Sequence, residues 1–96
     1  MNASEARNLE VVQRYYEGCN SGDIDDLMST FAPDVTHYFL PASFPPIRGA
    51  EALAKYWRWW KEKVDPVWRH DHLIARGDEV VSECQRRCET PQIAPV

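Results

Sequence analysis

The chain has 96 residues, which is enough for one domain with a modest hydrophobic core. Hydrophobic residues make up 44% and charged residues 27%, a composition typical of globular proteins. The net charge of -4 argues against a broad nucleic-acid-binding surface, and the sequence shows neither an apolar run of membrane-spanning length nor a signal-peptide core. We therefore expect no nucleic-acid partner, no membrane partner and a cytoplasmic location.

The first predicted element is an amphipathic helix over residues 4–19. Apolar side chains recur along it with helical spacing, and charged side chains occupy the opposite side. The segment Asn20–Gly22 should end this helix, because glycine readily adopts the left-handed conformation of a helix C-cap. Asp23 then predicts the N-cap of a short acidic helix that ends near Phe31.

The middle of the chain predicts a strand, an irregular segment and a third helix. Residues 35–40 are rich in β-branched and aromatic side chains, which favour a strand. Prolines between residues 41 and 46 then argue against regular structure as far as Arg48. A third amphipathic helix should follow from Gly49 to about Val64.

The rest of the sequence predicts an antiparallel hairpin and an irregular tail. Residues 67–76 read as one strand, Gly77-Asp78 favours a tight turn, and residues 80–86 return as the second strand. Residues 88–96 contain two prolines and little pattern. Because the helices must cover one face of the sheet, the sequence predicts a single α+β domain over residues 1–96.

The segment VVQRYYEGCNSGDIDDLMSTFAPDVTHYF, residues 11–39, resembles the opening of the NTF2-like superfamily, which includes ketosteroid isomerases and SnoaL-like polyketide cyclases. The resemblance implies a cone-shaped α+β domain in which three N-terminal helices pack on a curved antiparallel sheet around a pocket. The last strands of that sheet have no counterpart in this sequence. An incomplete sheet leaves an unpaired edge, so we expect a homodimer formed through the sheet.

The resemblance also makes Tyr15 a candidate catalytic residue. Residues 11–15 resemble the first helix of bacterial ketosteroid isomerases, whose matching tyrosine donates a hydrogen bond to an enolate oxygen. A phenol can stabilise developing negative charge in this way without ionising. Phe39 stands where those isomerases have an aspartate base, so steroid isomerisation by their mechanism is not expected. The alternative for Tyr15 is a core residue on an amphipathic helix.

The histidines are the candidates for acid/base chemistry, because an imidazole titrates near neutral pH. His37 should point to the same side of its strand as Phe39, which would be the pocket side. By strict alternation, His72 should share the face of Trp68 in the following hairpin. We therefore predict that Tyr15, His37 and His72 meet at one cavity as catalytic residues. Histidines that only form hydrogen bonds inside a polar pocket are the alternative.

Aromatic side chains should supply most of a ligand-binding wall. The tryptophans could equally fill the core or a dimer surface, and the facing of Glu83 depends on a one-residue register change. His70 and His72 could bind a metal ion together with Glu83. Two histidines two residues apart on a strand are a weak signal for a metal site, so we expect no metal and no cofactor. The predicted ligand-binding residues are Tyr16, Phe39, Trp57, Trp60, Trp68, His70 and Glu83. The predicted core residues are Leu9, Val12, Tyr16, Leu27, Phe31, Leu53, Trp57, Trp60 and Ile74.

These features predict a domain that binds a small hydrophobic molecule. Its most specific form would be a cofactor-free acid/base enzyme of the lyase, isomerase or hydrolase type. The alternative is a non-catalytic module whose exposed sheet serves dimerisation or protein contact. An enclosed pocket favours the first interpretation, and an occluded or solvent-filled one favours the second.

Overall fold

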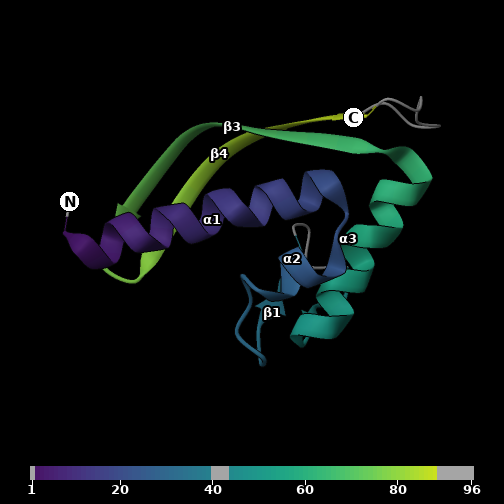
Figure 1. Ribbon diagram of the computed structural model, residues 1–96, viewed down its shortest axis with the longest axis horizontal. Helices are drawn as coiled ribbons and strands as arrows, with labels where there is room; N and C mark the ends of the chain where they lie inside the picture. Colours follow the sequence, from purple (N-terminus) through teal and green to yellow (C-terminus); the bar gives the residue numbers. More distant parts are fainter. Residues whose placement is uncertain (1, 40–43, 89–96) are drawn as a thin grey trace.

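The fold, described by a computed structural model for residues 2–39 and 44–88, combines three helices with two β-hairpins (Figure 1). In chain order the elements are α1 (Ala3–Ser21), α2 (Ile24–Met28), β1 (Thr36–His37), β2 (Ile47–Arg48), α3 (Ala50–Val64), β3 (Pro66–Arg76) and β4 (Glu79–Cys88). The predicted α+β class is confirmed. Residues 89–96 of the predicted tail lie outside the described residues.

Local sequence signals set both ends of α1. At its start, the Asn2 side chain accepts a hydrogen bond from the Glu5 backbone at 2.9 Å, and Glu5 accepts one from the Asn2 backbone at 2.8 Å. This reciprocal pair is a capping box. At its end, Gly22 takes a φ of 72°, and a Cβ there would lie 2.7 Å from the Lys61 side chain. Glycine is therefore required at this position both by conformation and by space.

The first hairpin differs from the prediction. Only Thr36–His37 forms the strand β1, and it pairs antiparallel with Ile47–Arg48, a segment predicted to be irregular. The prediction for Ile47–Arg48 was wrong because the last proline precedes these residues and so removes no hydrogen-bond donor from them. β1–β2 and β3–β4 are separate two-stranded sheets among residues 2–39 and 44–88. Leu40, in the predicted strand, lies outside the described residues.

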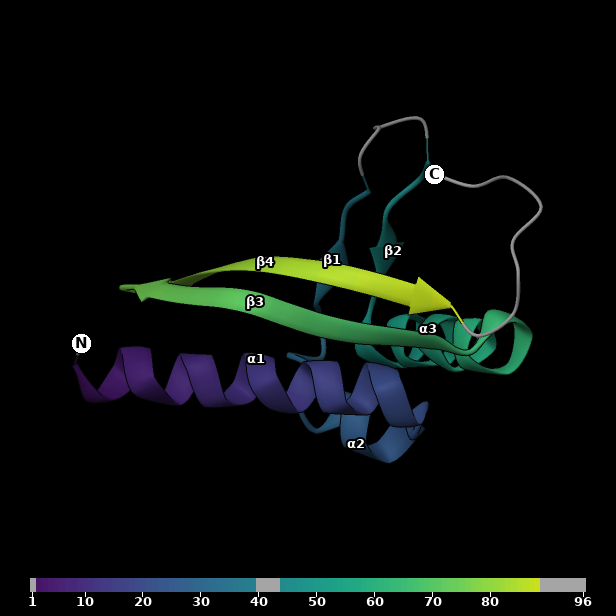
Figure 2. The same cartoon turned by 90° about the horizontal axis from the view of Figure 1, so that it is seen from above.

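The long β3–β4 hairpin runs along α1, as Figures 1 and 2 both show. Its register contains a β-bulge. His70 pairs with Cys84 and His72 pairs with Glu83, so Asp71 lies opposite no residue of β4. One extra residue in a strand reverses the alternation of its side chains beyond that point. Even-numbered residues of β3 therefore face the helices before the bulge, and odd-numbered residues face them after it.

Exposure along β3 follows this reversal. Before the bulge, Trp68 and His70 are partly buried; after it, Leu73 and Ala75 are partly buried. Ile74 is 62% exposed on the outer face. The prediction that Ile74 belongs to the core is therefore wrong, and so is the prediction that His72 shares a face with Trp68.

The core lies where the C-terminal part of α1 meets α2 and α3. Its predicted members Leu27, Leu53 and Trp57 are buried, which confirms those three. The remaining predicted residues are only partly buried: Leu9, Val12, Tyr16, Phe31 and Trp60. Within the described part of the chain, no helix combines the length and the hydropathy needed to cross a membrane.

Candidate functional site

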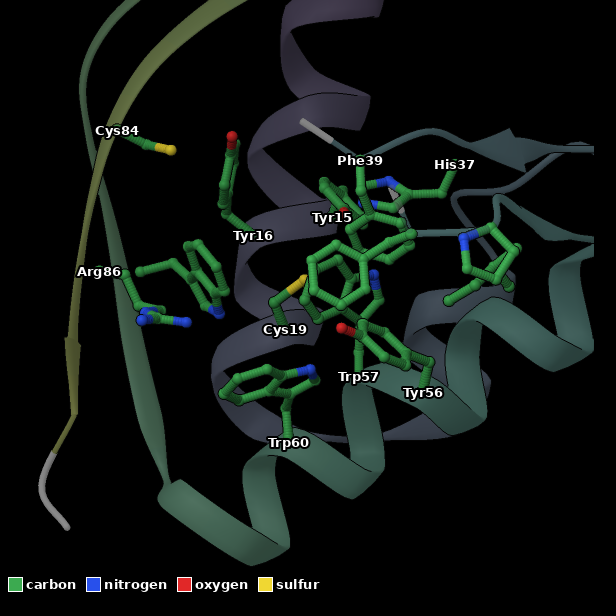
Figure 3. A pocket seen from close by; sticks show the side chains of 14 residues that line it. Tyr15, Tyr16, Cys19, His37, Phe39, Tyr56, Trp57, Trp60, Cys84 and Arg86 are labelled. Carbon is green, nitrogen blue, oxygen red and sulfur yellow. The ribbon is translucent and has the colours of Figure 1, made fainter. Parts of the chain in front are cut away.

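A pocket of about 710 Å³ lies between α1, α3, the first hairpin and β4 (Figure 3). Its lining is mostly aromatic. Among the described lining residues there is no aspartate or glutamate, and Arg86 is the only lysine or arginine. The lining residues are Tyr15, Tyr16, Cys19, His37, Phe39, Phe44, Pro45, Ile47, Tyr56, Trp57, Trp60, Trp68, Cys84 and Arg86.

Most of the residues predicted from the sequence to form a site lie together in this pocket. Tyr15 and His37 are the two predicted catalytic residues that line it. Figure 3 shows His37 and Phe39 on one side of Tyr15 and Tyr16 on the other. The predicted binding residues that line it are Tyr16, Phe39, Trp57, Trp60 and Trp68.

His72 and Glu83 lie elsewhere, so the prediction that they approach the pocket is wrong. Both are on the outer face of the hairpin, with side chains 71% and 73% exposed, and His72 Nδ1 is 3.3 Å from Glu83 Oε1. The bulge at Asp71 is the physical reason, because it turns His72 away from the helices. His70 is also outside the pocket, with its ring 5.5 Å from that of Tyr16. The described residues contain no group of three or more metal-ligating side chains placed to hold an ion.

Tyr15 is a hydrogen-bond donor that cannot ionise at physiological pH. Its ring packs against Phe31 at 5.6 Å and Trp57 at 6.4 Å between centroids. Burial, with a further contribution from the adjacent Cys19, raises the pKa of the phenol far above its usual value of 10. Burial also raises the pKa of the Cys19 thiol, to about 12. Both groups therefore stay protonated and neutral.

His37 is the one imidazole in the pocket lining. Its ring packs edge-on against Phe39 at 4.7 Å and against Trp57 at 5.4 Å between centroids. Burial among these rings lowers the pKa of His37 below its ordinary 6.5. The imidazole is therefore neutral at pH 7, and a neutral imidazole offers one nitrogen that can accept a proton.

This lowered pKa predicts that acid destabilises the fold through His37. Below pH 6.5 the unfolded chain takes up a proton that folded His37 resists, so stability should fall as the pH drops from about 7 to about 5. Urea unfolding of His37→Gln at both pH values should show a smaller loss than the wild type. His72→Gln, which removes an exposed imidazole, is the control and should lose as much stability on acidification as the wild type. An unchanged pH dependence in His37→Gln would contradict the prediction.

Arg86 is a pocket residue that sequence reasoning missed. Its guanidinium carbon lies 5.2 Å from the Trp60 ring centroid and 5.9 Å from that of Trp68. Both distances fit cation–π stacking. The missing signal was strand register: Arg86 pairs with Trp68 across the hairpin, so the two side chains share a face.

Polar contacts fix the hairpin, and with it the pocket wall, against α1. The Asn20 amide donates to the Trp68 carbonyl at 2.9 Å and accepts from the Trp68 backbone N–H at 2.6 Å. One turn earlier on α1, the Tyr16 hydroxyl donates to Ser82 Oγ at 2.9 Å. Asn20 therefore acts as a partner for the edge of β3 that faces away from β4.

Comparison with known proteins supports the fold. A family model described as a SnoaL-like domain matches residues 12–94. A cystatin-like-fold protein of unknown function from Methylobium petroleophilum PM1 superposes with a TM-score of 0.71 at 22% identity, over 96% of this chain and 82% of that one. No curated protein matches the sequence.

Two solved enzymes have the same fold. An LEH-like epoxide hydrolase from M. tuberculosis gives a TM-score of 0.79 at 17% identity, over 91% of this chain. SalBIII, an epoxide hydrolase/cyclase-like enzyme involved in pyran ring formation in salinomycin, gives 0.69 at 22% identity, over 85% of this chain. The chain spans 64% of the length of each of these two proteins. At such identities the similarity establishes the fold and leaves the activity open.

Proposed function

The chain belongs to the SnoaL-like domain family, and we propose that it binds a small, largely apolar organic molecule in the pocket between α1, α3 and the hairpins. The observation that carries the proposal is the pocket itself. Its volume of about 710 Å³ lies within the range typical of small-molecule sites. Its aromatic walls offer a large apolar contact area, and a few polar groups are available to orient a ligand.

Acid/base chemistry on the bound molecule would fall to Tyr15 and His37. Tyr15, held protonated, would donate a hydrogen bond to a ligand oxygen. His37, held neutral, would accept a proton. Since the described lining contains no carboxylate, His37 is the natural base in this pocket, and the proposal requires no metal or cofactor.

The test is binding of a neutral aromatic ketone, 2-acetonaphthone, followed by quenching of tryptophan fluorescence. Because tryptophans line the pocket, a bound naphthyl ring should quench them. Tyr15→Phe removes one hydrogen-bond donor and should weaken ketone binding by up to about tenfold, the effect of one hydrogen bond. Naphthalene, which has no acceptor, should bind both proteins equally.

Tyr38→Phe is the matched control, because Tyr38 is 70% exposed and does not line the pocket. It should bind both probes like the wild type. If neither the ketone nor naphthalene quenches the wild type, the proposed function is wrong. If both bind but Tyr15→Phe changes nothing, the pocket is a binding site in which Tyr15 donates no hydrogen bond.

A second candidate function is self-association through the hairpin. Ile74 and Val81 are cross-strand neighbours on its outer face and are 62% and 63% exposed. The edge of β4 opposite β3 pairs with no strand in the described part of the chain. Exposed apolar pairs and open edges favour association with another chain.

A homodimer formed in this way predicts one species of twice the chain mass in sedimentation at micromolar concentration. Val81→Lys, which places a charge on the outer face, should shift the protein towards monomer. Val11→Lys, on α1 and 37% exposed, is the control and should remain dimeric. A wild-type protein that sediments as a monomer would exclude this candidate.

A further inference from the structure

Beyond the bulge, the outer face of the β3–β4 hairpin carries a continuous strip of exposed side chains. Ser82, on the other face of β4, accepts a hydrogen bond from Tyr16 of α1 at 2.9 Å, so the strip faces away from the helix. Figure 1 shows no described element on that side of the hairpin. This surface, called the outer strip below, consists of His72, Ile74 and Arg76 of β3 and Glu79, Val81 and Glu83 of β4.

The outer strip has three levels, and its charge is divided by strand. At the tip of the hairpin, Arg76 on β3 is paired in register with Glu79 on β4. The middle level is the apolar pair Ile74 and Val81. The level next to the bulge again sets a carboxylate on β4 against a basic side chain, an imidazole, on β3. The β3 side of the strip therefore carries the basic groups, and the β4 side carries the carboxylates.

The two charges at the tip are not used within the protomer. Among the described residues, neither Arg76 nor Glu79 forms an ion pair or a side-chain hydrogen bond. On the other side of the bulge, by contrast, Arg69 lies 3.6 Å from Asp71. Arg76 and Glu79 are therefore available to the charges of another molecule.

A second copy of the chain matches this strip. When two copies pack face to face about a two-fold axis parallel to the strands, β3 of each copy lies over β4 of the other. At the tip, Arg76 then lies over the partner's Glu79. In the middle, Ile74 lies over the partner's Val81. Because the axis repeats each contact in the reverse sense, every level of the strip meets its own complement.

The other simple two-fold arrangement lacks this complementarity. An axis perpendicular to the strands, passing through the middle level, places β3 over β3 and β4 over β4. Glu79 would then lie over the partner's Glu83, and like charges would repel each other. We propose, resting on the self-association suggested above, that the protein forms a two-fold dimer in which the outer strips pack face to face with β3 over the partner's β4.

The first test is the salt dependence of the wild-type dimer. Sedimentation equilibrium should show that raising the NaCl concentration from about 50 mM to about 500 mM weakens dimerisation about threefold or more, because salt screens attraction between exposed charges. The arrangement with β4 over β4 predicts the opposite sign, since screening would relieve its repulsion. This series uses only the wild type, so it decides the proposal even if a variant fails to fold.

The second test reverses one charge at a time and then mixes the variants. Arg76→Glu and Glu79→Arg should each weaken homodimerisation about tenfold or more, because both tip contacts become repulsive. An equimolar mixture should recover most of the wild-type association, because one tip then carries only negative charge and the other only positive charge. Mixing could not restore a role that the pair plays inside a single hairpin.

Lys63→Glu is the control, because it makes the same charge change as Arg76→Glu at an exposed position on α3, and it should dimerise like the wild type. Side-by-side pairing of the β4 edges would keep β3 away from the partner, so Arg76→Glu would then leave association unchanged.

The outcomes separate the arrangement from the self-association on which it rests. A wild-type dimer that salt strengthens or leaves unaffected, or a mixture that stays monomeric, would overturn the arrangement and leave self-association intact. A monomeric wild type would exclude both. Ligand binding in the pocket is a separate claim, because the outer strip contributes no residue to the described pocket lining.

Discussion

Replacing Trp57 with alanine should lower the free energy of unfolding by about 3–5 kcal/mol, the usual cost of truncating a large buried aromatic side chain. Trp57 is 8% exposed. Its ring packs against Tyr15, His37, Tyr56 and Trp68 at centroid distances of 5.1–6.4 Å. Small domains are stable by only about 5–15 kcal/mol, so this one change should remove much of the stability.

Urea unfolding followed by circular dichroism measures the effect, and Trp59→Ala supplies the control. Trp59 is the same residue type two positions along α3, but it is 50% exposed and lies outside the pocket. Its replacement should cost much less than that of Trp57. Equal losses for the two variants would show that Trp57 does not support the core more than a surface tryptophan does.

Helix positions could be predicted from the sequence because their signals are local. Asp23 as the N-cap of α2 and Gly22 as the C-cap of α1 were both expected, and the structure confirms them. A cap depends on a few neighbouring residues, all visible in the sequence. The apolar face of α3 placed Trp57 in the core for the same reason.

The facing of side chains along β3 and β4 could not be predicted, because it depends on a pairing that the sequence does not display. A single bulge at Asp71 turned His72 and Ile74 outward. Alternation is reliable only while the register is continuous, and one inserted residue exchanges the two faces. The same dependence on register hid Arg86, whose place in the pocket follows from pairing with Trp68.

The lining residues that the sequence singled out come mainly from the helices, and the hairpin supplied lining residues that the sequence did not single out. Tyr15 and Trp57 come from helices, where spacing alone sets the face. Cys84 and Arg86 come from β4, where no apolar pattern marked a face. His37 was placed correctly because its strand is short and contains no bulge.

Asn20→Ala should cost about 2–3 kcal/mol and loosen the wall that Trp68 forms. The substitution removes both hydrogen bonds to the Trp68 backbone, at 2.9 Å and 2.6 Å, in a partly buried setting. Unpaired buried backbone groups cost about 1–3 kcal/mol each, and partial access of water to the edge of β3 should moderate the sum. Urea unfolding measures the loss, and hydrogen exchange at the Trp68 amide, which donates to Asn20, should become faster.

Asn8→Ala is the matched control on the same helix. Asn8 also links α1 to the hairpin, donating to the Gly77 carbonyl at 3.2 Å, but this contact is exposed and single. Water can replace it, so the cost should be well below that of Asn20→Ala. If the two variants lose similar stability, or if the Trp68 amide exchanges at the wild-type rate in Asn20→Ala, then Asn20 does not hold the hairpin. The position of Trp68 would then depend on the pairing of β3 with β4 and on its packing with Trp57 and Arg86.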